Sequence, residues 1–210
     1  MNLYYAPLAC SFACHLLIRE TGLAVKLIPV ALSRKQLDTG ADYFNITPKG
    51  QVPVLRFDDG RLLTENSAVL QALARLAAAE GHTGYLPEPG TVAQYEVLEW
   101  LSFISTEIHK LCLYPLFQRD APDAVKEWSQ GLLAGKLQIV ANRTAQRPFL
   151  VGNQFTVADA YLTWALMLCE QSGVGFLGVE GLDTYWAQIK ARPAFGECLA
   201  HEGRLYKTMA

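Results

Sequence analysis

Short apolar runs alternate with stretches of helical periodicity over the first part of the chain, the arrangement that βαβ units produce. Leu3–Tyr5 has the character of a strand, and the apolar residues after it recur at helical spacing up to Gly22, which is placed to cap a helix. Asp58-Asp59-Gly60 is a turn signal between two apolar runs and predicts an antiparallel hairpin. The elements predicted here are strands at 3–5, 25–30, 52–57 and 61–63, and helices at 10–21, 37–44 and about 65–80.

A cluster of turn-forming residues separates this part from the rest of the chain. Three glycines and two prolines lie between Gly81 and Gly90, and no strand pattern of comparable quality interrupts the helical patterns beyond them. The helices predicted there are 92–113, 124–144, 157–172, 182–191 and 195–202. We therefore expect an α/β domain at 1–81, a linker at 82–90 and an all-helical domain at 91–210.

Composition and charge narrow the class of protein. Apolar residues make up 51% of the 210 residues and charged residues 18%, so the chain can bury a sizeable core. The formal net charge of -2, with acids and bases interspersed, gives no electrostatic footprint for nucleic acid or an anionic membrane. No apolar stretch approaches the roughly 20 residues that span a bilayer, and no basic leader segment is visible. The five scattered cysteines favour a reducing cytoplasm over a disulfide framework.

Cys10 is the first candidate for chemistry. It follows the first strand where the chain turns into a helix, so its sulfur is expected near the positive N-terminal end of that helix. That location favours the reactive thiolate, although burial as a small apolar side chain explains the position equally well. Cys14 lies one turn further on, and this spacing matches neither a redox C-x-x-C motif nor a four-ligand zinc site, so no metal is predicted. Packing is the plainer explanation for Cys112, Cys169 and Cys198.

Two further segments offer groups that would suit a short peptide ligand. Val52-Pro53 opens a predicted strand, and a cis bond there would leave the backbone of Val52 available to an extended peptide, whereas a trans proline is the commoner state. Glu65, Asn66 and Ser67 lie at the start of a predicted helix, where amides bind a carboxylate and the Glu65 carboxylate suits an ammonium group. An ordinary helix cap explains these three residues as well.

One histidine and one capping motif complete the candidates. His109, in Glu107-Ile108-His109-Lys110, lies in the middle of the first long helix of the second half, where a solvated helix face also explains it. Nothing pairs it with an acid at the spacing of metal ligands. Thr156 and Asp159 have the arrangement of a capping box, for which we predict a role in folding. The other histidines are interpreted as structural or surface residues: His15, His82 and His201.

Together these segments resemble the glutathione S-transferase family, most closely its bacterial beta class. Six segments carry the resemblance, in the family's order and across nearly the whole chain: Leu3–Ser11, Asn45–Pro53, Leu63–Glu65, Glu99–Leu101, Glu107–Lys110 and Phe155–Tyr161. The resemblance implies a thioredoxin-like N-terminal domain of order βαβαββα, an all-α C-terminal domain, a cytoplasmic location and a homodimer. The implied activity is conjugation of the glutathione thiolate to a small hydrophobic electrophile, with glutathione as substrate and no metal.

The resemblance also implies roles for individual residues. Cys10 and His109 would approach the glutathione sulfur as the catalytic residues. Glu65 and Asn66 would hold the γ-glutamyl end, and the backbone of Val52, after a cis bond, would pair with the cysteinyl unit. The residues implied to bind glutathione are Tyr5, Lys35, Gln51, Val52, Pro53, Glu65, Asn66, Ser102 and Lys110, and those expected to line the electrophile pocket are Tyr114, Phe117 and Trp164.

Two positions depart from the family pattern. Asn66 stands where many relatives carry serine, or glycine within the beta class, and Ser102 stands where close relatives often carry an asparagine that reaches the neighbouring subunit's glutathione. Conjugation and thiol-disulfide exchange through Cys10 are both open at this point, and a non-catalytic protein-interaction module of the same fold is the alternative to either. A glutaredoxin-like reductase is disfavoured because Cys10-Ser11-Phe12-Ala13 lacks a second cysteine.

Overall fold

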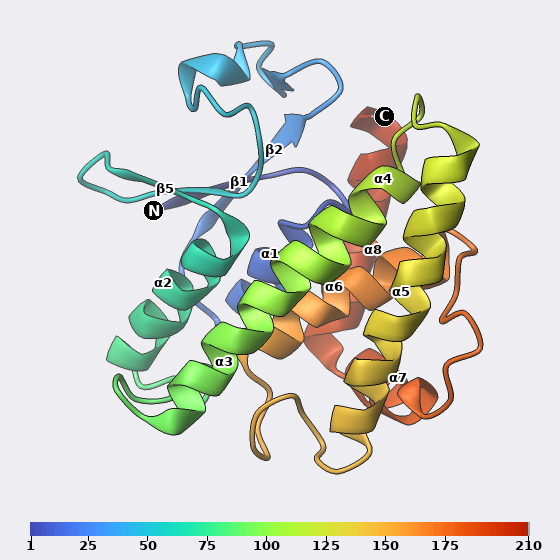
Figure 1. The fold of residues 1–210 in the computed structure, drawn as a ribbon. Coiled ribbons are helices and arrows are strands. Elements are labelled where there is room, and N and C mark those ends of the chain that lie inside the picture. Colours follow the sequence, from blue (N-terminus) through green and yellow to red (C-terminus); the bar gives the residue numbers. More distant parts are fainter. Residues whose placement is uncertain (210) are drawn as a thin grey trace. The chain divides into compact units, whose positions relative to one another are not determined.

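The structure is a computed structural model that describes residues 1–209. Contacts divide the described chain into two compact units: Met1–Thr83 together with the last segment from Lys190, and Gly84–Ile189 (Figure 1). The domain boundaries predicted from the sequence remain a proposal about which segments fold independently. Among the helices described, none combines the length and apolar character that a membrane crossing requires.

A mixed five-stranded sheet runs through the first unit. Its order is β3-β2-β1-β4-β5, with β1 and β2 parallel and the other neighbours antiparallel. The strands are β1 (Asn2–Tyr5), β2 (Lys26–Ala31), β3 (Gln36–Leu37), β4 (Val54–Arg56) and β5 (Leu62–Thr64). The predicted hairpin is confirmed, because Val54 pairs with Thr64 across the turn at 58–60.

Alternation along β1 sends neighbouring side chains to opposite faces of the sheet. Tyr4 belongs to an apolar cluster on one face with Tyr43 and Val54, whereas the ring of Tyr5 contacts His15 of α1. The helices of this unit are α1 (Phe12–Thr21), α2 (Asn66–Ala79) and α8 (Pro193–Met209), and α1 contacts both of the others. α8 extends beyond the predicted 195–202 at both ends, and a proline at its first position suits a helix start.

The helix predicted at 37–44 is wrong. Leu37 instead ends β3, and the chain turns at Gly40, whose φ of 81° is left-handed. The Gly40 amide donates to the Leu37 carbonyl at 3.0 Å, and only a single 3-10 turn, η1 (Tyr43–Asn45), follows. Asp, Thr and Gly side by side compete with helical hydrogen bonding and favour a turn, so this segment cannot continue as a helix.

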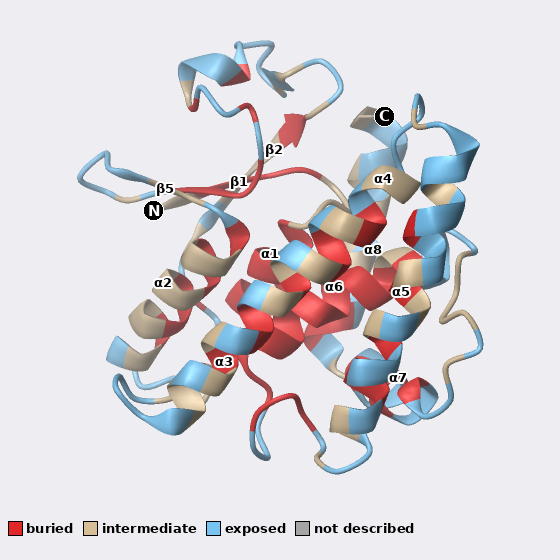
Figure 2. Cartoon of the chain, in the orientation of Figure 1, coloured by how far each residue is buried: buried red, intermediate tan, exposed pale blue. Residues whose placement is uncertain are grey.

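The second unit, as far as it is described, consists of helices joined by loops. They are α3 (Val92–Phe103), η2 (Ile104–Leu113), α4 (Tyr114–Leu116), α5 (Asp123–Thr144), α6 (Val157–Gln171) and α7 (Leu182–Lys190). Figure 2 shows α6 coloured as buried along most of its length, and 12 of its 15 residues are buried. A helix that is buried on all sides is a core helix, and the helix predicted at 157–172 is confirmed.

The helix predicted at 92–113 continues without a break but changes its hydrogen-bond pattern. From Ile104 to Leu113 it is a π-helix, and at its end the Tyr114 amide donates to the carbonyl of His109, five residues back. π-helical turns are rare in proteins, and a large share of those known lie at functional sites. This one contains His109 and Lys110.

Asp159 closes the N-terminus of α6, and the predicted capping box is confirmed. Its Oδ2 accepts from the Thr156 amide at 2.9 Å and from the Thr156 hydroxyl at 2.8 Å. Its Oδ1 accepts from the Leu150 amide and the Tyr185 hydroxyl, both at 2.9 Å. One buried carboxylate therefore joins α6 to the loop before it and to α7.

Candidate functional site

Cys10 lies in the turn between β1 and α1. Leu8 in this turn has a left-handed φ of 60°, and Cys10 directly precedes Ser11, the N-cap of α1. The Cys10 thiol donates to the Val52 carbonyl at 3.4 Å. The Val52–Pro53 bond is cis, as the resemblance implied. The sulfur of the first candidate residue therefore lies beside the segment expected to pair with a peptide.

Two buried side chains hold this turn in place. The Ser11 hydroxyl accepts from the Ala6 amide at 3.1 Å and donates to the Ala6 carbonyl at 3.2 Å. Glu202 of α8 accepts from the Leu8 amide at 2.7 Å, and its other oxygen is 2.8 Å from Nδ1 of His15. Burial raises the pKa of the Glu202 carboxyl to about 8 and lowers the pKa of His15 to about 4. The turn before Cys10 is thus fastened to the last helix through a buried polar pair.

The start of α2 combines a strained residue with exposed charge. Glu65, directly before α2, has φ 72°, a value that non-glycine residues seldom adopt and that is found at ligand sites. Its carboxylate is 2.6 Å from the Lys49 ammonium, and both side chains are largely exposed. Asn66 is buried; its Oδ1 accepts from the Cys14 thiol at 3.2 Å, while its Nδ2 has no hydrogen-bond partner among the described residues. The helix amides and the Glu65 carboxylate suit a ligand that carries both a carboxylate and an ammonium group.

Two more of the predicted residues lie at the backbone segment just before the cis bond. The Lys35 ammonium donates to the Gly50 carbonyl at 2.8 Å. The Gln51 carbonyl accepts from the Tyr43 hydroxyl at 3.0 Å, and the Gln51 side chain is exposed. Lys35 and Gln51 therefore border the same stretch of backbone, next to Val52.

Tyr5 is a deeply buried member of the predicted glutathione-binding residues, with 1% of its surface exposed. Its hydroxyl is 3.1 Å from Nε2 of His201 on α8, and its ring contacts His15. Burial raises the pKa of Tyr5 above its usual range, with the nearby Glu202 charge acting in the same direction. A direct contact between Tyr5 and glutathione stays a prediction.

His109 is a buried histidine of η2 that touches two aromatic residues of α6. Its Nδ1 is 2.7 Å from the Tyr161 hydroxyl. Its ring centroid is 4.5 Å from that of Trp164, at an angle of 64°. Burial lowers the pKa of His109 to about 3, and the positive charge of Lys110 acts in the same direction. The imidazole is therefore neutral at pH 7.

The other predicted residues of the second unit lie mostly on exposed surface. The Lys110 ammonium is 4.9 Å from the ring centroid of Tyr114, a cation-π contact. Tyr114 and Phe117 are large aromatic side chains that are 47% and 38% exposed, whereas Trp164 is buried against His109. Ser102 is exposed on α3. Two of the three residues expected to line an electrophile pocket thus present apolar surface to solvent.

The predicted residues divide between the two units. Those in the first unit are Tyr5, Cys10, Lys35, Gln51, Val52, Pro53, Glu65 and Asn66, and those in the second are Ser102, His109, Lys110, Tyr114, Phe117 and Trp164. Direct contacts join Cys10 to Val52 in one unit and His109 to Trp164 in the other. Within residues 1–209, no three His, Cys, Asp or Glu side chains are grouped so that they could hold a metal ion.

Three residues that touch the candidate site were not predicted. Lys49 and Tyr161 both lie inside segments that carry the family resemblance, so a signal existed for each, although the sequence does not show which neighbour each one binds. Glu202 lies outside those segments and had no such signal. The amide that it binds is 194 positions away in the sequence.

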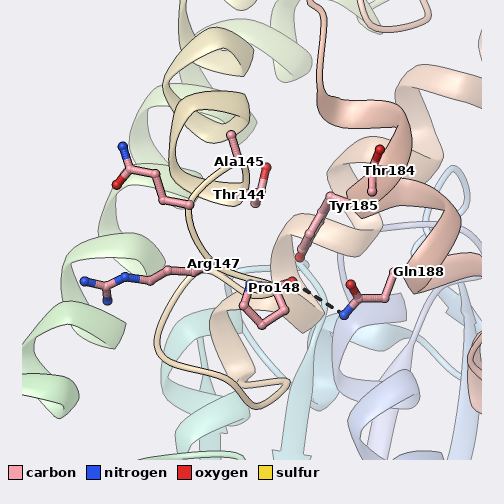
Figure 3. Close-up of a pocket in the computed structure, with 8 residues that line it drawn as sticks. Thr144, Ala145, Arg147, Pro148, Thr184, Tyr185 and Gln188 are labelled. Atoms are coloured by element: carbon pink, nitrogen blue, oxygen red, sulfur yellow. Dashed lines mark hydrogen bonds between the residues drawn. The ribbon is translucent and has the colours of Figure 1, made fainter.

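A separate hollow of about 270 Å³ lies in the second unit (Figure 3). It is lined by Thr144, Ala145, Gln146, Arg147, Pro148, Thr184, Tyr185 and Gln188. None of the predicted site residues is among them, and the Gln188 amide donates across it to the Pro148 carbonyl at 3.5 Å. We therefore do not include it in the candidate site.

Comparison with known proteins places this geometry in a family. Residues 9–76 match the N-terminal domain of glutathione S-transferases, and residues 104–193 match their C-terminal domain. The glutathione S-transferase GstA of Escherichia coli O157:H7 is 37% identical, covering 97% of this chain and 99% of its own. The chain belongs to the glutathione S-transferase family. This confirms the predicted family and the predicted combination of a thioredoxin-like α/β half with an all-helical half.

Solved structures narrow the position of this transferase within the family. A sphingomonad glutathione S-transferase complexed with glutathione superposes with a TM-score of 0.89 at 34% identity, covering 97% of this chain and 99% of its own. The bacterial beta class transferase of Sphingomonas chungbukensis also gives a TM-score of 0.89, at 32% identity and with the same coverage. The transferase is therefore similar to a bacterial beta class enzyme over nearly its whole length, in agreement with its sequence motifs.

Proposed function

We propose that this glutathione transferase joins the sulfur of glutathione to small hydrophobic electrophiles, with Cys10 and His109 acting on that sulfur. The observation that carries this assignment is the arrangement around Val52, where the Cys10 thiol lies 3.4 Å from the carbonyl just before a cis proline. An extended peptide can pair with such a backbone segment, and its own thiol would then lie near Cys10.

The chemical task is to ionise the glutathione thiol. A thiol with a pKa of about 8.5 is only a few per cent ionised at pH 7, and the thiolate is the nucleophile. In the conjugation step the thiolate attacks an electrophilic carbon, a new S–C bond forms, and the leaving group departs with its bonding electrons. The thiol proton passes to solvent. Groups that donate hydrogen bonds to the sulfur favour the ionised form and therefore raise the rate.

The charged ends of glutathione match the polar groups of the first unit. Glu65 would bind the ammonium of the γ-glutamyl unit, while the first amides of α2 would bind its carboxylate. Lys49, whose ammonium contacts the Glu65 carboxylate, would bind the carboxylate of the same γ-glutamyl unit. Lys35 and Gln51 border the backbone before Val52 and would hold other parts of the tripeptide.

Aromatic surface in the second unit supports an apolar electrophile. Tyr114 and Phe117 lie near the end of the η2–α4 helix and are partly exposed, so covering them with an apolar ligand would remove their surface from water. Trp164 would contribute indirectly, because its ring is buried against His109. Family membership argues for an enzyme over a non-catalytic interaction module.

Thiol-disulfide exchange is the second activity that a specific observation favours. Cys10 is partly exposed, whereas Cys14, Cys112, Cys169 and Cys198 are buried. A Cys10 thiolate that attacks oxidised glutathione would form a Cys10–glutathione disulfide and release one glutathione thiolate. Burial raises the pKa of the thiol of Cys198 far above its usual range, so that cysteine should not compete.

The test combines turnover with intact mass. Wild type, Cys10→Ala and the buried control Cys198→Ala are assayed for conjugation of a chloronitroarene and are weighed after exposure to oxidised glutathione. We expect conjugation by the wild type and a glutathione adduct that only Cys10→Ala fails to form. A folded wild type that neither conjugates the chloronitroarene nor retains glutathione would overturn the proposal, and an adduct on Cys10→Ala would overturn the assignment of the thiol.

Two further features belong to this proposal. We infer a homodimer in the cytoplasm, since the family usually assembles in this way and the five cysteines, none of which is paired in a disulfide, favour a reducing compartment. Sedimentation equilibrium should then give twice the 23.2 kDa mass of the chain. A concentration-independent mass of one chain would contradict the dimer without affecting the assignment of the chemistry.

A further inference from the structure

His109 is held from one side by a single helix. Both of its aromatic contacts come from α6, where Tyr161 and Trp164 lie three residues apart and therefore on one face. The Tyr161 hydroxyl meets Nδ1 at 2.7 Å, a short distance for a neutral pair, and Tyr161 is 1% exposed. The ring of His109 can thus neither turn over nor exchange this partner for water without disturbing the core helix.

α6 is a rigid support for this contact. Its first turn is closed by Asp159, which accepts four hydrogen bonds and lies two residues before Tyr161. The opposing element, η2, carries His109 in a π-helical turn whose last hydrogen bond ends on the His109 carbonyl. Both partners of the contact are therefore fixed through their backbones as well as their side chains.

The direction of the hydrogen bond follows from the acidity of the two groups. A neutral imidazole has one nitrogen that donates and one that accepts. A phenol, with a pKa of about 10, is a stronger acid than a neutral imidazole N–H, and a phenol oxygen is the poorer acceptor. The arrangement with the phenol O–H donating and Nδ1 accepting is the stronger of the two.

We propose that Tyr161 is the positioning residue of His109: its hydroxyl donates to Nδ1 and so keeps the ring proton on Nε2, the nitrogen left to bind the glutathione sulfur. This inference rests on the proposed function, because it assigns to His109 one of two possible roles at that sulfur. With its proton on Nε2 the ring stabilises a thiolate by donating a hydrogen bond, and it does not accept the thiol proton.

The electrostatic surroundings of His109 agree with a donor. Burial lowers the pKa of the ring to about 3, so the imidazole is too weak a base to take a proton from a thiol whose pKa is about 8.5. The charged group that acts on the ring is Lys110 of the same helix, and its positive charge also opposes protonation. A neutral donor is thus the form that exists throughout the neutral pH range.

The first experiment reads the tautomer directly and needs no turnover. In protein labelled with nitrogen-15 at histidine, the two ring nitrogens of His109 differ in chemical shift according to which one carries the proton; a His109→Gln variant assigns the signals. We expect a protonated Nε2 and an unprotonated Nδ1 in the wild type and a mixture of both tautomers in Tyr161→Phe. Tyr185→Phe removes another buried hydroxyl, one that donates to Asp159, and should leave the His109 signals unchanged.

The second experiment measures the ionisation of bound glutathione. The ultraviolet absorbance of the thiolate is followed against pH for the wild type, Tyr161→Phe and Tyr185→Phe. Losing one well-oriented hydrogen bond should raise the pKa of the bound thiol by about 1 unit and lower kcat/KM near pH 6.5 by about 5- to 10-fold. The deficit should shrink at high pH, where glutathione ionises without help. A merely structural loss would lower activity equally at all pH values.

The outcomes separate this inference from the proposed function. A protonated Nδ1 in the wild type, or a thiol pKa that Tyr161→Phe leaves unchanged, overturns the role of Tyr161 while conjugation by the wild type still supports the function. Conversely, a protonated Nε2 in a protein that does not bind glutathione would show that Tyr161 sets the tautomer of His109, but it would overturn the role of that ring at the glutathione sulfur.

Discussion

Removing the Asp159 carboxylate should destabilise the second unit more than any change at its surface. Asp159→Ala deletes the acceptor of four hydrogen bonds and leaves the amides of Leu150 and Thr156 buried without it. Each buried donor that loses its acceptor costs roughly 1–3 kcal/mol. Burial opposes ionisation of Asp159 and raises its pKa, while these donors act in the opposite direction. We therefore expect the free energy of unfolding to fall by about 3–5 kcal/mol, a large part of a typical total.

The assay is urea unfolding followed by circular dichroism and tryptophan fluorescence at one protein concentration. Asp183→Ala is the matched control, because it removes an exposed aspartate from the first turn of α7. Thr156→Ala should fall between the two, at about 1 kcal/mol, the usual cost of losing a capping hydroxyl. If Asp159→Ala shifted the midpoint no further than Asp183→Ala, the reasoning from unsatisfied buried donors would be refuted.

Three further predictions concern the first unit. Burial raises the pKa of Glu202 from 4.5 to about 8, so the free energy of unfolding should fall as the pH rises between those values. Burial lowers the pKa of His15 from 6.5 to about 4, so His15 adds stability as the pH rises between about 4 and 6.5 and opposes the fall only there. Glu202→Gln should therefore flatten the fall in urea midpoint between about pH 6.5 and 8; an unchanged slope would contradict it. Lys49→Met breaks an exposed ion pair and should change the free energy of unfolding by less than about 0.5 kcal/mol, which calorimetry can check. Arg192→Ala leaves the nearly buried carboxylate of Glu20 without two hydrogen bonds of 2.7 Å and should cost about 2–3 kcal/mol, with Arg192→Lys recovering part of it.

Local patterns predicted most of the elements because each follows from a short stretch of chain. The hairpin depends on a turn at 58–60 between two apolar runs, and the cap of α6 depends on Thr156 and Asp159, three residues apart. The segment 37–44 failed for a local reason as well, since Gly40 in a left-handed conformation outweighs the apolar residues around it. Spacing could not reveal the π-helix at Ile104–Leu113, because its apolar residues also fit an α-helix.

Contacts between distant segments account for what the sequence did not predict in the site. The Glu202 carboxylate and the Leu8 amide are 194 positions apart, and the Tyr161 hydroxyl and His109 are 52 apart. Such pairs depend on how whole helices pack, which no window of sequence contains. The motifs did locate Cys10 and Val52, because the family resemblance joins segments that spacing alone does not connect.

The first unit is built from two segments that flank the second unit in the sequence, and this sets the order in which it can be completed during synthesis. A ribosome releases the turn around Cys10 early, but the carboxylate that accepts from the Leu8 amide belongs to α8 and emerges almost 200 residues later. The second unit lies between them in the chain and can condense first. The nascent protein therefore acquires the Cys10 thiol early, but the carboxylate that fastens the turn before it is made only after the whole second unit.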